Sequence, residues 1–201
     1  GGKVFPAIGA VIGMMKGYEY GYKGKVPPYV VTPVAKGRFS ELGFLNPRYR
    51  PLVTGGDPNA AVFAVEGIVN QSLSKEQQVK NREFLGKVDA MGMDTVANPD
   101  QRKFDAAGSE AYELITGEAG EVFDLGKETK ETRDSYGRNT LGQSCLAARR
   151  IVEAGVPYVT INAPGWDTHK RHFQTLRQKS PQLDQGLSAL LRDLADRKLL
   201  D

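Results

Sequence analysis

The spacing of apolar and polar positions predicts two helices in the last part of the chain. In the first, over 139–154, apolar residues recur at intervals of three and four and so share one helical face: Leu141, Cys145, Ala148 and Val152. Gly155 stands where a C-terminal cap is expected. The second helix, over 181–198, begins at Ser180-Pro181, and its apolar stripe has the same spacing: Leu183, Leu187, Leu190 and Leu194.

Between these helices, the run from Val156 to Ile161 predicts a buried strand. The run is β-branched and aromatic and does not alternate with polar residues, as is typical of strands that are covered on both faces of a largely parallel sheet. Pro157 fits only near its start, because proline has no N–H to donate to a ladder. We therefore expect an α/β fold in which this interior, mostly parallel strand is flanked by the helices 139–154 and 181–198.

The earlier part of the chain carries weaker patterns. They predict a short buried helix over 5–17, a short strand over 29–32, an edge segment over 62–65, and helices over 74–91 and 98–114. The region 34–59 is rich in Gly, Pro, Asn and Arg, and its scattered apolar residues indicate a long loop that packs on the body. Its clearest turn is expected at 54–58.

Composition narrows the class of protein. The 201 residues, 40% of them hydrophobic, suffice for one core, so residues 1–201 are expected to form a single α/β domain portion. The net charge is only +3, which argues against nucleic acid, and the pair Arg149-Arg150 is expected on the solvated surface. No run of apolar residues is long enough to cross a bilayer. Cys145, the only cysteine, is expected to be a small core residue.

Candidate chemistry gathers in the loop after the predicted strand. Both histidines of the chain, His169 and His172, lie close to Asp167 there. Open α/β sheets bind ligands at the carboxyl ends of their strands, and Asp and His are ligands of zinc and manganese. From the residues alone, two interpretations stay open. Either Asp167 and His169 hold a metal, or Asp167 or Thr168 caps a helix beginning near His169, with His172 in solvent.

Two further side chains are ambiguous. Trp166 would either stack on a sugar or cover the end of the sheet. Arg138 would either point toward the site or decorate a helix surface.

Several segments resemble the bacterial family catalogued as domain of unknown function 1501. They are Tyr136-Gly137-Arg138, Gly142-Gln143-Ser144-Cys145-Leu146, Ala148-Arg149-Arg150, Val152-Glu153-Ala154-Gly155-Val156 and Gly165-Trp166-Asp167-Thr168-His169. That family is similar to sulfatases and falls within the alkaline-phosphatase-like superfamily. The resemblance implies a truncated alkaline-phosphatase/sulfatase-like fold. It also implies that the chain is the central portion of a longer protein and is inactive alone.

The resemblance also implies a function. Family members are often exported, so a periplasmic or extracellular location is expected. The expected activity of the whole protein is metal-dependent hydrolysis of phosphate or sulfate esters, with a small molecule or a glycan as substrate. Asp167 and His169 match the Trp-Asp-x-His motif and become the expected ligands of a divalent metal: zinc, manganese or calcium. Trp166, His172 and Arg138 are candidates for contacts with substrate or with the ligands. The alternative is a non-catalytic relative that binds glycan or another protein.

Overall fold

The structure is a computed structural model that describes residues 5–37, 40–61, 63, 65 and 119–200. In chain order its elements are α1 (Ile8–Lys16), the 3-10 helix η1 (Tyr18–Tyr20), β1 (Tyr29–Thr32), η3 (Pro47–Tyr49), β2 (Leu52–Val53), α4 (Ala119–Phe123), η4 (Leu125–Lys127), α5 (Lys130–Tyr136), α6 (Thr140–Glu153), β3 (Tyr158–Ile161) and α7 (His172–Asp196). The predicted helices 74–91 and 98–114 lie outside the described residues, as do Val62 and Ala64 of the predicted edge segment. Among the helices that are described, none is both long and apolar enough to cross a bilayer.

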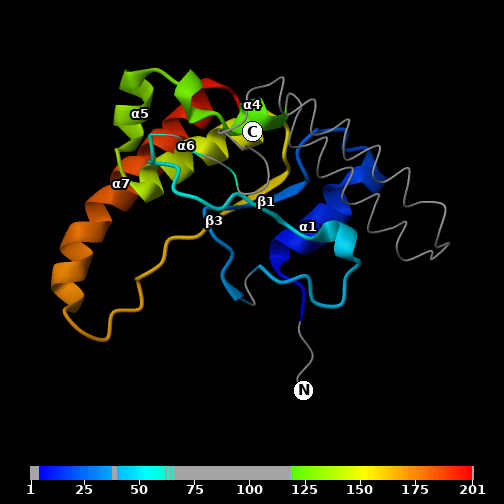
Figure 1. Ribbon diagram of the computed structural model, residues 1–201, viewed down its shortest axis with the longest axis horizontal. Helices are drawn as coiled ribbons and strands as arrows, with labels where there is room; N and C mark the ends of the chain where they lie inside the picture. Colours follow the sequence, from blue (N-terminus) through cyan, green and yellow to red (C-terminus); the bar gives the residue numbers. More distant parts are fainter. Residues whose placement is uncertain (1–4, 38–39, 62, 64, 66–118, 201) are drawn as a thin grey trace, which may run out of the picture.

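The fold is α/β, as predicted, with a small parallel sheet between helices (Figure 1). The strand order is β2-β1-β3, and β1 pairs in parallel with both neighbours. The interior position predicted for 156–161 is therefore wrong for the described sheet, because β3 is an outer strand with all four residues half-buried. The central strand is β1, whose four residues are all buried.

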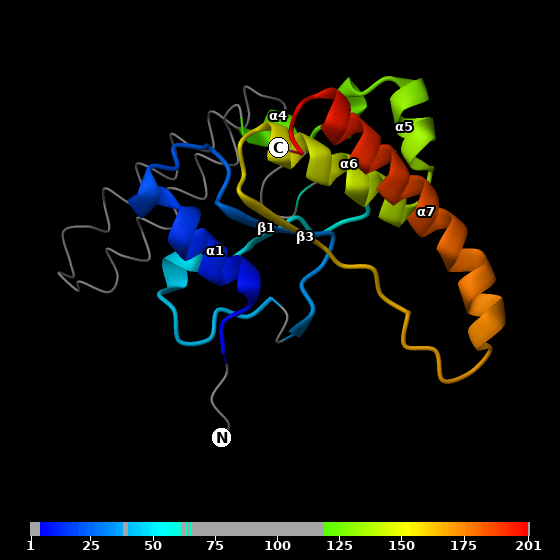
Figure 2. The ribbon, with the colours of Figure 1, turned by 180° about the vertical axis from the view of Figure 1, so that it is seen from behind.

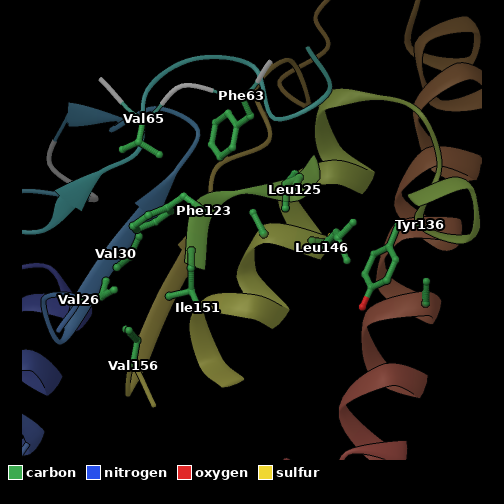
Figure 3. Packing of buried hydrophobic residues seen from close by; sticks show 13 residues of the cluster. Val26, Val30, Phe63, Val65, Phe123, Leu125, Tyr136, Leu146, Ile151 and Val156 are labelled. Carbon is green, nitrogen blue, oxygen red and sulfur yellow. The ribbon is translucent and has the colours of Figure 1, made fainter. Parts of the chain in front are cut away.

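The two faces of β1 belong to two different clusters of buried side chains. Because side chains alternate along a strand, Val30 faces the α6 side while Tyr29 and Val31 face the α1 side. Figure 3 shows Val30 within the α6-side cluster, which also contains Leu146, Ile151, Phe123 and Val156. On the other side α1 approaches so closely that a Cβ on Gly9 would lie 2.3 Å from the ring of Tyr29. The sheet is thus covered on both faces, as a parallel sheet requires.

Helix α6 forms because both of its ends carry strong local signals. The Asn139 side chain accepts a hydrogen bond from the Gly142 N–H at 2.9 Å. At the other end Gly155 is left-handed (φ 88°), and the N–H groups of Gly155 and Val156 bond the carbonyls of Val152 and Ile151, as in a Schellman motif. The predicted single buried face is too narrow, since every residue from 142 to 149 is buried. The reason is position: α6 contacts the sheet, α4, α5 and α7.

Helix α7 begins at His172, so Pro181 lies inside the helix and does not start it. Its buried residues are Gly186 and Ala189, whereas Leu183 and Leu187 of the predicted stripe are 37% and 44% exposed. Small residues face α6 because the two backbones nearly touch: a Cβ on Gly186 would lie 3.1 Å from the Cα of Gly142. Figures 1 and 2 show the amino-terminal half of α7 projecting away from the sheet.

Candidate functional site

The carboxyl ends of the three strands form one polar edge. Thr32 ends β1, Thr54 follows β2, and Asn162 follows β3. The Thr54 N–H donates to the Val31 carbonyl at 2.9 Å, and the Asn162 N–H donates to the Thr32 carbonyl at 2.8 Å. The two threonines are fully buried, and the Thr54 hydroxyl donates to the Thr32 hydroxyl oxygen at 3.1 Å. Buried hydroxyls satisfied in this way fix the edge from which the loop after β3 departs.

The loop 162–171 leaves this edge and runs out to the start of α7 (Figure 1). Its first residue is tied down twice, because the Asn162 side-chain amide also donates to the Val34 carbonyl at 2.7 Å. The sequence prediction of a polar loop at the carboxyl end of the strand 156–161 is confirmed.

Asp167 and His169 are brought together in this loop. His169 Nε2 lies 3.0 Å from Asp167 Oδ1, and each side chain is 84% exposed. That separation is the contact distance of an ordinary histidine–carboxylate ion pair. Two ligands of a tetrahedral zinc ion, each about 2.0 to 2.2 Å from the metal, stand roughly 3.3 to 3.6 Å apart, so these two atoms would part slightly to share an ion. Within the described ranges, no third His, Cys, Asp or Glu completes a group of three around them. The pair alone would hold an ion weakly and leave it open to other ligands.

The helix-capping alternative is wrong. The N-cap residue of α7 is Arg171, which is left-handed (φ 53°), and no side chain caps this helix. Thr168 instead lies beside the end of the loop, with its hydroxyl 2.5 Å from His172 Nδ1. His172 is exposed, and its ring stands edge-on to Phe173 with centroids 5.3 Å apart. Asp167 therefore has no role as a cap that would account for its position.

Trp166 and Arg138 lie in different surroundings. Trp166 is half-buried, and the ammonium of Lys179 in α7 stands 5.8 Å from its ring centroid. Arg138 follows α5, and its guanidinium donates to Asp134 Oδ1 at 2.6 Å and to the Lys130 carbonyl at 3.4 Å. Hydrogen bonds from Lys130 and Arg138 hold the pKa of Asp134 below its usual range. The hydrogen bonds of Arg138 thus go to α5, whereas Trp166 lies in the loop next to the Asp167–His169 pair.

A buried ionic cluster was missed by the sequence reasoning. Arg149, expected on the surface, is 2% exposed in the middle of α6. Its Nη1 donates to Glu153 at 2.7 Å. Its Nη2 lies 2.7 Å from Glu128 and its Nε lies 3.1 Å from Asp193, and both are charge pairs without hydrogen-bond geometry. Burial alone would lower the pKa of Arg149, but the hydrogen bonding and charge of its acidic partners outweigh burial and raise it.

Further contacts extend the cluster to α5 and to the end of α7. Arg150 pairs with Glu128, Arg197 pairs with Asp193, and the Tyr136 hydroxyl donates to Asp193 at 2.9 Å. Burial raises the pKa of Tyr136, so its hydroxyl stays a donor. Because the charges are already paired, the cluster fastens α7 to α6 and is not a ligand site.

Cys145 is confirmed as a core residue. It is 3% exposed, and burial raises the pKa of its thiol to about 11. A thiol that stays protonated near neutral pH is a poor nucleophile.

A cavity of about 250 Å³ lies elsewhere, beside η4 and α5. It is lined by Ala60, Ala61, Phe63, Asp124, Leu125, Gly126 and Arg133, and so by none of the sequence-predicted site residues. The guanidinium of Arg133 already makes structural hydrogen bonds, because it donates to Gln143 at 2.7 Å and to the Pro58 carbonyl at 3.4 Å.

Comparisons with curated proteins and with solved structures find no match. A family profile, described as "Protein of unknown function (DUF1501)", matches residues 2–201. The resemblance that the Gly-Trp-Asp-Thr-His segment and its companions indicated is thereby confirmed at the level of the family, while the kinship with sulfatases stays a prediction. With nearly its whole length matched, the chain belongs to the DUF1501 family.

Proposed function

We propose that the protein is a metal-dependent hydrolase of phosphate or sulfate esters in which Asp167 and His169 hold the metal. The observation that carries the proposal is the 3.0 Å separation of their donor atoms in the loop that follows β3. Two facts support it: the loop leaves the ligand-binding edge of a parallel sheet, and neither residue caps a helix. Export of the protein and a small-molecule or glycan ester as its substrate are part of the same proposal, and both follow from the resemblance to sulfatases.

A bound zinc, manganese or calcium ion would polarise a phosphoryl or sulfuryl oxygen and make a bound water more acidic. The chain contributes an anionic oxygen from Asp167 and an imidazole nitrogen from His169. Histidine must lose its ring proton to become a ligand, so acid should weaken binding. Because both side chains are largely exposed, the ester can reach them directly from solvent.

The second candidate is a non-catalytic relative that binds glycan or protein. The observation in its favour is that, in the part of the chain that is described, the Asp167–His169 pair has no third ligand. The half-buried ring of Trp166 beside the pair is the kind of surface on which a sugar stacks.

Calorimetric titration of the full chain with Zn²⁺ and Mn²⁺ tests the proposal. Asp167→Asn and His169→Ala should each weaken binding more than about tenfold, because each removes a ligand. Asp184→Asn, which removes an exposed carboxylate from α7, is the matched control and should bind like wild type. The same proteins are then assayed on aryl phosphate, aryl sulfate and a sulfated oligosaccharide.

The outcomes separate the two candidates. If both ligand variants titrate like wild type, the metal proposal is overturned. Chelator-insensitive binding of the oligosaccharide, without hydrolysis and without metal, would favour the non-catalytic relative.

A further inference from the structure

The loop 162–171 is held by contacts at two places. At its root Asn162 is bonded to the segment after β1, as described above. Further along, Lys179 of α7 reaches back across the loop, and its ammonium donates to the Pro164 carbonyl at 2.6 Å. The same ammonium stands 5.8 Å from the centroid of the Trp166 ring, within the range of a cation–π contact.

The segment 164–166 is shaped around this ammonium. Gly165, between the two contacting residues, is left-handed (φ 80°), and a Cβ there would lie 2.7 Å from Lys179 Nζ. The positive φ is what favours glycine here, because the flexible end of Lys179 could move away from a Cβ. Three successive residues therefore surround one charged group, and Asp167 is the next residue along the chain.

Within the described part of the chain, no other residue of α7 makes a hydrogen bond to the middle of this loop. Lys179 makes the only hydrogen bond from α7 to residues 163–167. The contact between Thr168 and His172 is local and ties the end of the loop to the first residue of α7. Without Lys179, the stretch that carries Trp166 and Asp167 would be linked to the body mainly through its two ends.

We infer that Lys179 is a positioning residue that holds Asp167 and His169 in place through Pro164 and Trp166. The effect on metal affinity rests on the proposed function, whereas the contact with Trp166 does not. A lysine over an indole ring at an exposed site contributes modestly, so loss of the ammonium should weaken metal binding about two- to fivefold. Removing a ligand should cost more than that.

Trp166 is the only tryptophan of the chain, so tryptophan fluorescence reports on the surroundings of this one ring. The experiment uses the full chain with Lys179→Met, which keeps the length of the stem, and Lys179→Arg, which keeps the charge and the donors. Arg177→Met is the matched control, because it removes an exposed charge of the same sign from the same helix. Each protein is checked by circular dichroism, then measured for emission maximum, acrylamide quenching and Zn²⁺ affinity.

Lys179→Met should shift the emission to longer wavelength, make quenching more efficient and weaken Zn²⁺ binding. Lys179→Arg should restore all three toward wild type, and Arg177→Met should change none. If Lys179→Met has the emission maximum and the quenching of wild type, the inference is overturned, whatever its affinity for Zn²⁺. Altered fluorescence with unchanged Zn²⁺ affinity would overturn the positioning role. If wild type binds no Zn²⁺ but the fluorescence responds as expected, the proposed function fails and the contact stands.

Discussion

Replacing Arg149 by methionine should destabilise the protein strongly, although no predicted site residue is touched. Methionine keeps much of the side-chain volume and removes the guanidinium, which is 2% exposed. The change leaves Glu128, whose side chain is 11% exposed, and Asp193, at 23%, without their shared partner. The effect is therefore that of uncompensated, partly buried carboxylates rather than that of a cavity.

The remaining partners set the magnitude. Breaking a buried ion pair by removing one member costs about 3 to 5 kcal/mol. Glu128 keeps Arg150, and Asp193 keeps Arg197 and the Tyr136 hydroxyl. Glu153 is 42% exposed, so its contact with Arg149 should add less than about 1 kcal/mol. We expect a loss near the lower end of the range, about 3 kcal/mol of unfolding free energy.

The loss should also depend on pH. Burial alone would raise the pKa of Glu128 and of Asp193, but hydrogen bonds and the positive charge of Arg149 outweigh it and lower both. A carboxyl whose folded pKa is lowered stabilises the protein above its unfolded pKa, and that stability is lost as pH falls through the folded pKa. Wild type should therefore lose stability below about pH 5. The variant should lose less, because it lacks the charge that lowers these pKa values.

Urea denaturation at pH 7 and pH 4 measures both effects. The difference between wild type and Arg149→Met should be large at pH 7 and should narrow at pH 4. Arg192→Met, at an exposed arginine of α7, is the control and should cost less than about 0.5 kcal/mol. A loss for Arg149→Met below about 1 kcal/mol, or one equal at both pH values, would refute the reasoning.

Two further substitutions test the packing that supports the loop. In thermal denaturation, Gly142→Ala should lower the free energy of unfolding by more than about 2 kcal/mol, because the new Cβ would lie 2.0 Å from the Tyr136 carbonyl oxygen. A gain of about 1 kcal/mol, which is usual for this change inside a helix, would contradict the close contact between Gly142 and Tyr136. Thr54→Val keeps the shape of the side chain and removes the hydroxyl that donates to Thr32, so urea denaturation should show a loss of about 1 to 2 kcal/mol of unfolding free energy. An unchanged urea midpoint would show that this buried hydrogen bond does not stabilise the protein.

The parts of the fold that were predicted correctly have local causes. Helix α6 could be located from its amphipathic spacing and from Gly155, whose left-handed conformation ends it. The order of the strands has no local cause. Strand β1 is central because β2 and β3, which lie far from it in sequence, pair on its two sides. Strand β2 has only two residues, too few to show any period.

Helix α7 shows why apolar spacing can indicate the wrong face. The leucine stripe has the correct period and Leu190 packs on the buried cluster, but Leu183 and Leu187 are exposed. The residues buried against α6 are Gly186 and Ala189, because the backbones approach too closely at Gly186 for a large side chain. A hydrophobicity pattern gives glycine little weight and so cannot find such a contact. The predicted start of α7 was wrong because proline is common at the first position of a helix. Inside a helix it removes a backbone hydrogen bond and its ring crowds the carbonyl four residues earlier, yet α7 runs from His172 through Pro181.

The candidate site follows the same division between local and distant causes. Asp167 and His169 could be proposed as a pair because a strand and its following loop are one continuous stretch, and the structure brings the two side chains together within that stretch. The partners that support that stretch come from elsewhere: the Lys179 side chain reaches Pro164 from α7, and the carbonyl of Val34, 128 residues away, accepts a hydrogen bond from the Asn162 side chain. In the sequence, Lys179 is one more charged residue just before the predicted helix 181–198, and its contact with the loop appears only in the folded chain. If the proposed metal binds there, a substitution that weakens its binding without touching Asp167 or His169 should therefore be sought first on α7, the helix to which the loop returns.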